Sequence, residues 1–81
     1  MNTQARIYRE TAADLRAVSA EDYLERTCLV RHPFVCSGML RANYVGGKAP
    51  RTAFELRAVM DAAANDCEAK SQDVRFIGGA A

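Results

Sequence analysis

The segment from residue 51 to residue 70, RTAFELRAVMDAAANDCEAK, constrains the fold more than any other stretch, because its local signals all indicate a helix. Thr52 and Glu55 have the spacing of a capping box, in which the hydroxyl accepts from a first-turn N–H and the carboxylate reaches back to the cap. Beyond this cap the apolar side chains recur at helical spacing, at Leu56, Val59, Met60, Ala63 and Cys67. Polar residues line the opposite face, so we predict a helix over residues 52–70 with one buried side.

The first half of the chain indicates three shorter helices, at about residues 10–18, 20–31 and 33–45. Thr11 and Asp14 have capping-box spacing at the start of the first. The apolar positions before and after Ser19 fall on opposite sides of one continuous helix, so a break at Ser19 is the more economical interpretation, with Asp22 three residues later. Pro33 ends the second helix and can open the third, because proline pushes the residue before it out of the α region.

Three segments could form other structures. Residues 34–45 could also form a hairpin that turns at Ser37 and Gly38, but their apolar residues repeat at helical spacing, and Gly46 and Gly47 suit the end of a helix. Residues 5–9 and 74–77 are short, rich in β-branched and aromatic residues, and typical of strands. A short two-stranded β ribbon joining the two terminal segments would pair them.

These patterns predict a mainly α, small four-helix domain that spans residues 1–81 as a single globular unit. The short two-stranded β ribbon of the terminal segments could add to it. Its predicted core is formed by Leu15, Val18, Leu24, Cys28, Val35, Met39, Leu40, Tyr44, Phe54, Leu56, Val59, Met60, Ala63, Cys67 and Phe76. A chain of 81 residues buries a lower fraction of its surface than a larger domain does, which leaves homo-oligomerisation open.

Composition excludes two classes of protein. Hydrophobic residues at 49% and charged residues at 26% lie far from the signature of intrinsic disorder. No apolar run is long enough to cross a membrane, and the first residues contain no apolar stretch of signal-peptide length. We therefore expect a soluble cytoplasmic protein that does not bind membranes.

The net charge of +1 conceals a segregated pattern. Residues 10–25 carry five acids against one arginine, residues 26–57 carry six bases against one acid, and residues 58–73 carry four acids against one lysine. One interpretation is that these segments neutralise each other across the fold. The other is an exposed basic surface for an acidic partner or a polyanion, formed by Arg31, Arg41, Lys48, Arg51 and Arg57.

Three cysteines and one histidine are the residues with the clearest potential for chemistry. Cys28, His32 and Cys36 are spaced four residues apart, and Cys67 could complete a tetrahedral zinc site. However, Pro33 interrupts the register, and no C-x₂-C pair is present. A cysteine nucleophile with His32 as base lacks any local signature for an orienting group. We predict buried thiols, no metal, no cofactor and no enzymatic activity.

Two nucleic-acid or nucleotide motifs are incomplete. Gly46, Gly47 and Lys48 precede a helix but depart from the phosphate-binding GxxxxGK[ST] pattern. Residues 33–70 could form a helix-turn-helix, but the connection from Gly46 to Arg51 is longer than that motif's turn, and a pI of 7.7 is low for a nucleic-acid binder.

The leading hypothesis is a small non-enzymatic protein-binding module that acts as an inhibitor or adaptor by occupying a surface of a larger partner. This hypothesis includes an inhibitor of host defence encoded by a phage or a mobile element. Two alternatives stay open, a nucleic-acid-binding or regulatory protein that uses residues 26–57, and a small zinc-binding domain. Segregated charge is the feature that favours a partner.

Overall fold

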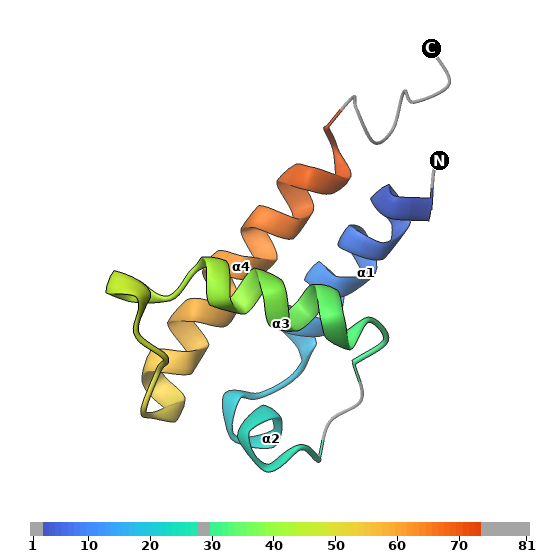
Figure 1. Ribbon diagram of the computed structural model, residues 1–81. Helices are drawn as coiled ribbons and strands as arrows, with labels where there is room; N and C mark the ends of the chain where they lie inside the picture. The colour runs from blue at the N-terminus through green and yellow to red at the C-terminus, as the bar shows by residue number, and fades with distance from the viewer. Residues whose placement is uncertain (1–2, 28–29, 74–81) are drawn as a thin grey trace.

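The computed structural model describes residues 3–27 and 30–73, which form four α-helices and one short 3-10 helix. In chain order these are α1 (Thr3–Ala17), α2 (Ala20–Glu25), α3 (Pro33–Ala42), η1 (Val45–Gly47) and α4 (Ala53–Ser71). Helices α1 and α4 lie side by side in opposite directions, α3 crosses them on one side, and α2 lies near the end where α1 finishes (Figure 1). The mainly α, four-helix prediction is confirmed.

The core lies between the paired helices α1 and α4 and beneath α3. Leu15 and Met60 are completely buried at its centre, and Ala63 and Ala64 provide small side chains where α4 meets the rest of the core. Small side chains at a helix contact allow the two axes to approach closely. The buried cluster consists of Ala12, Leu15, Ala20, Cys36, Met39, Leu40, Leu56, Val59, Met60, Ala63, Ala64 and Cys67.

The predicted helix caps are confirmed at two positions. The Ser19 hydroxyl accepts a hydrogen bond from the backbone N–H of Asp22 at 3.0 Å, and the Thr52 hydroxyl accepts one from Glu55 at 3.1 Å. Pro33 occupies the first turn of α3, as expected for a residue with a fixed φ and no N–H. Because α3 is a helix, the hairpin alternative for residues 34–45 is wrong.

The N-terminal prediction is wrong. Residues 5–9 belong to α1, which begins at Thr3, so the N-terminal half of the predicted ribbon does not exist; residues 74–77 lie outside the described residues. Thr11 lies inside the helix, where its hydroxyl donates to the carbonyl of Ile7 at 2.8 Å instead of capping a helix start. Ala5 and Leu15 are fully buried in the same helix, so burial extends along its length and outweighs the strand-like composition.

Other departures concern helix length and the core. Helix α2 ends at Glu25, earlier than predicted, with Arg26 in the left-handed region at φ 57°. Leu24 is 54% exposed and Phe54 is 86% exposed, so both were assigned to the core wrongly. The predicted core members Cys28 and Phe76 lie outside the described residues. The other predicted members are buried or packed against the buried cluster.

Candidate functional site

The structure divides the five predicted basic residues into two groups. Arg31 is paired inside the fold, because its guanidinium contacts the Asp14 carboxylate at 2.8 Å and the Glu10 carboxylate at 3.4 Å. Burial acts to raise the pKa of Asp14, but hydrogen bonds and charge from Arg31 outweigh it and hold that pKa below its ordinary value. Arg31 therefore joins the loop before α3 to α1.

Arg57 is also used inside the fold. Its Nη1 donates to the carbonyl of Val18 at 2.8 Å and its Nη2 to the carbonyl of Leu15 at 2.7 Å. Its Nε donates to Asp61, four residues later on α4, at 3.0 Å. Backbone carbonyls at a helix C-terminus lack partners within the helix, so Arg57 caps α1 from α4. Arg31 and Arg57 therefore both form ion pairs within the described chain, with Asp14 and Asp61 respectively.

Arg41, Lys48 and Arg51 form the second group. Arg41 lies in the last turn of α3, and the other two lie in the connection between η1 and α4. All three are exposed, and none forms an ion pair with an acid within residues 3–27 and 30–73. These three cations are the exposed part of the predicted site that has no ion pair among the described residues.

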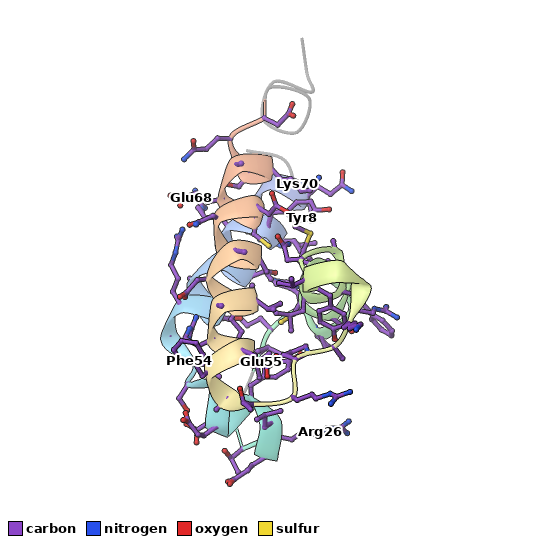
Figure 2. All side chains as sticks on the ribbon, turned by 90° about the vertical axis from the view of Figure 1, so that its left-hand side faces the viewer. Tyr8, Arg26, Phe54, Glu55, Glu68 and Lys70 are labelled. Atoms are coloured by element: carbon purple, nitrogen blue, oxygen red, sulfur yellow. The ribbon has the colours of Figure 1, made fainter. Side chains whose placement is uncertain are left out.

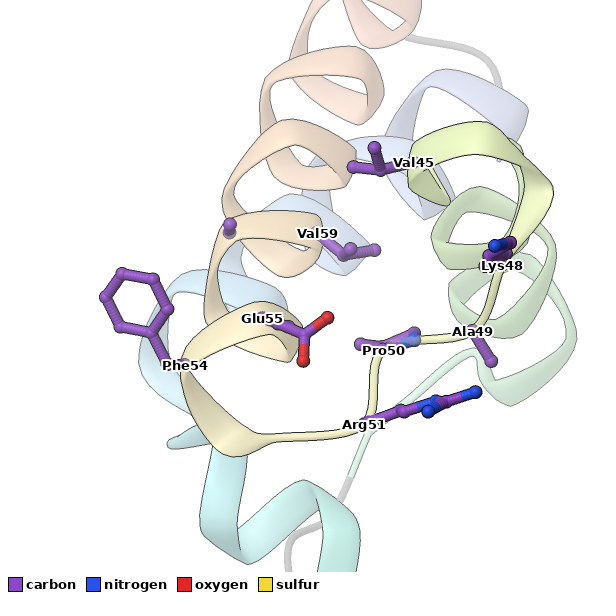
Figure 3. A pocket seen from close by; sticks show the side chains of 9 residues that line it. Val45, Lys48, Ala49, Pro50, Arg51, Phe54, Glu55 and Val59 are labelled. Atoms are coloured by element: carbon purple, nitrogen blue, oxygen red, sulfur yellow. The ribbon is translucent and has the colours of Figure 1, made fainter.

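Two glycines direct the connection that carries Lys48 and Arg51. Gly46 has a φ of 62° and Gly47 a φ of 74°, values that glycine adopts without steric cost. The N–H of Lys48 donates to the carbonyl of Val45 at 3.2 Å and closes the turn. The chain then runs back along α4 toward its first residue (Figure 3).

A groove of about 560 Å³ lies between this connection and the first two turns of α4. We call it the basic groove; it is lined by Val45, Lys48, Ala49, Pro50, Arg51, Phe54, Glu55, Ala58 and Val59. Figure 3 shows Val59 and Glu55 directed into the groove from α4, with Lys48 and Arg51 on the side of the connection. The ring of Phe54 points away from the connection. The groove thus combines an apolar lining with a cationic edge.

Exposed apolar side chains gather around the same segment. Val45, 81% exposed, lines the basic groove, and Phe54, 86% exposed, borders it with its ring directed away from the connection (Figure 3). A second hollow, of about 230 Å³, lies on the other side of Ala49 and Pro50 and is lined in part by the exposed Leu24 and by Arg26. Large apolar side chains that stay exposed next to a concave surface are typical of binding sites.

Glu55 is the acid within the groove, and its position has a local cause. Its carboxylate accepts a hydrogen bond from the Thr52 hydroxyl at 3.3 Å, while its N–H donates back to that hydroxyl. The capping arrangement that begins α4 therefore also places a negative charge beside the apolar lining of the groove. Figure 2 shows Glu55 and Phe54 on different sides of the first turn of α4.

The residues considered for metal binding or catalysis have other roles where the structure describes them. His32 Nε2 lies 2.8 Å from a carboxylate oxygen of Glu10, a contact that lowers the pKa of Glu10. Cys36 and Cys67 are buried, and burial with the nearby Cys36 raises the pKa of Cys67 to about 11. Cys67 is thus a protonated thiol at neutral pH. Cys28 lies outside the described residues, and within residues 3–27 and 30–73 no three metal-ligating side chains come together.

Sequence reasoning did not find the groove. Gly46, Gly47 and Pro50 marked a non-helical connection, but nothing local indicated that it folds back along α4. Phe54 was assigned to the core although it lines the groove.

Within the described residues, no helix is both long and apolar enough to cross a membrane. No protein-family model, curated protein or solved structure matches the chain.

Proposed function

We propose that this protein is a small non-enzymatic binding module that occupies a surface of a larger protein, as an inhibitor or adaptor. The observation that carries the proposal is the coincidence of exposed cations and exposed apolar side chains on one surface. Arg41, Lys48 and Arg51 have no acidic partner in the described chain, and the last two line a groove with Val45. Protein interfaces combine an apolar centre with a charged rim in this way.

Charge complementarity favours an acidic partner surface. Within the described residues, Asp14 and Glu10 pair with Arg31 and Asp61 pairs with Arg57, whereas Lys48 and Arg51 form no ion pair with an acid. Lys48 and Arg51 consequently present positive charge to solvent. Such charge increases the rate and specificity of association with an acidic surface.

The test is a charge reversal that leaves the fold intact. The variant R41E/K48E/R51E should lose binding to the partner that the wild-type chain retains, with a loss of unfolding free energy below about 1 kcal/mol, as expected for solvated sites. The matched control is R6E/R9E/K70E, which makes the same change in net charge at exposed positions on α1 and α4. Cross-linking with mass spectrometry and thermal melting measure the two effects.

Three outcomes contradict the proposal. Equal loss of binding in both triple variants would show a dependence on net charge alone. A large drop in melting temperature for R41E/K48E/R51E with binding retained would show that these residues pair internally. Retention of nucleic acid without a protein partner, weakening steeply and independently of base sequence as salt rises, would favour the nucleic-acid alternative.

A further inference from the structure

We propose that the basic groove accepts an apolar side chain from an acidic segment of the partner protein, with Lys48 and Arg51 pairing with carboxylates beside that side chain and Glu55 excluding polyanions. The inference rests on the proposed function and specifies the ligand of the same surface. Its first support is size. A groove of about 560 Å³ accommodates a large apolar side chain together with part of its backbone, and lies within the range of known ligand pockets.

The lining indicates what enters. Val45, Pro50 and Ala58 contribute apolar surface, and Val45 is 81% exposed in the isolated chain. Covering these side chains removes apolar area from water, which is the main favourable term in most protein association. A purely polar ligand would leave this area wet, so the part of the ligand at the centre of the groove is apolar.

The charges decide the chemistry around that apolar group. Lys48 and Arg51 extend from the connection on one side of the groove, whereas the Glu55 carboxylate is directed into it from α4 (Figure 3). Carboxylates of the ligand are therefore favoured at the edge formed by the connection and disfavoured next to α4. A polypeptide satisfies both conditions, because acidic and apolar side chains can alternate along it.

The same arrangement selects against nucleic acid. A phosphate backbone carries closely and regularly spaced negative charges, and one lying in the groove would bring them against Glu55. Base stacking would need an aromatic face in the groove, yet the Phe54 ring is directed away from the connection. Glu55 thus acts as a specificity determinant in addition to capping α4.

The direct test uses two synthetic peptides, acetylated and amidated, with the sequences Gly-Gly-Leu-Asp-Asp and Gly-Gly-Ser-Asp-Asp, which carry carboxylates on only one side of the central residue. Titrated into the full chain and followed by backbone-amide NMR, the leucine peptide should shift the amides of residues 45–59. The serine peptide has the same charge and should bind about tenfold more weakly, which corresponds to the loss of one buried apolar side chain. Equal binding of both peptides, or shifts confined to other residues, would overturn the proposal.

Two variants test the individual parts. Ala58→Trp places a bulky side chain in the groove from an exposed helix position and should abolish the peptide shifts while the melting temperature is retained; Ala62→Trp, also exposed on α4, is its control. Glu55→Gln keeps a capping residue at its position. The Glu55→Gln variant should retain more oligothymidylate than the wild-type chain, and its binding of the leucine peptide should not be weaker. Unchanged retention of oligothymidylate would remove the selective role of Glu55.

Different results would contradict the groove hypothesis and the proposed function. If Ala58→Trp leaves partner binding intact while R41E/K48E/R51E abolishes it, the chain is a binding module that does not use the groove. If R41E/K48E/R51E leaves partner binding intact, the proposed function itself is wrong.

Discussion

The Asp14 carboxylate on α1 accepts two kinds of hydrogen bond from Arg31. The backbone N–H of Arg31 donates at 3.0 Å, and the guanidinium Nη2 of Arg31 donates at 2.8 Å. The guanidinium also donates to the backbone carbonyl of Glu10 at 3.1 Å. The residue next to Arg31, His32, contacts the Glu10 carboxylate at 2.8 Å. Two carboxyls on α1 thus bind the chain immediately before α3 and hold this part of the chain against α1.

The first prediction concerns acid stability. The pKa values of Asp14 and Glu10 are lowered in the folded protein. Such a group adds stability at pH values above its unfolded pKa, near 4, and the stability is lost as the pH falls through the lower folded value. We expect a level melting temperature from neutral pH to about pH 5 and a decline below about pH 4.

The variant Asp14→Asn tests the origin of this decline. It should lower the melting temperature at neutral pH and flatten the acid limb, because the titrating carboxyl is gone while the side chain keeps its size. Glu25→Gln, at the exposed end of α2, is the control and should follow the wild-type curve. An acid limb of unchanged slope in Asp14→Asn would show that other groups cause the decline.

The second prediction concerns Arg57, which donates to two carbonyls at the end of α1. Arg57→Met keeps the aliphatic part of the side chain but leaves both carbonyls without this donor, and should cost about 1–3 kcal/mol of unfolding free energy. Arg51→Met removes an exposed cation from the connection and should change stability by less than about 0.5 kcal/mol. Urea unfolding measures both, and equal losses would contradict the role of Arg57 as a cap.

The third prediction uses two adjacent alanines on α4. Ala63 is fully buried within the core cluster, whereas Ala62 is exposed. Ala63→Leu adds volume where there is no room and should destabilise the protein by about 1–3 kcal/mol. Ala62→Leu adds the same atoms toward solvent and should be nearly neutral, within about 0.5 kcal/mol. Urea unfolding measures both losses of unfolding free energy. Equal losses would contradict the assignment of Ala63 to the buried face of α4 and Ala62 to its exposed face.

Helix α4 and its cap, the break at Ser19 and the start of α3 at Pro33 were predictable from the sequence. Each depends on interactions within a few residues, such as the Thr52 and Ser19 hydroxyls reaching a first-turn N–H, or the fixed φ of proline. Local interactions of this kind do not depend on what the segment later packs against. The starts of α2, α3 and α4 therefore follow from local interactions alone.

The tertiary structure decided the rest. Residues 5–9 are helical because α1 packs along α4, and Phe54 is exposed because the connection that could have covered it runs along the other side of the first turn of α4. Arg31 and Arg57 look like Arg41, Lys48 and Arg51 in sequence, but only the first two have acids or carbonyls from α1 within hydrogen-bonding distance. Charge composition is a property of the chain, whereas the pairing of charges depends on distances between segments that only the packing of α1, α3 and α4 sets.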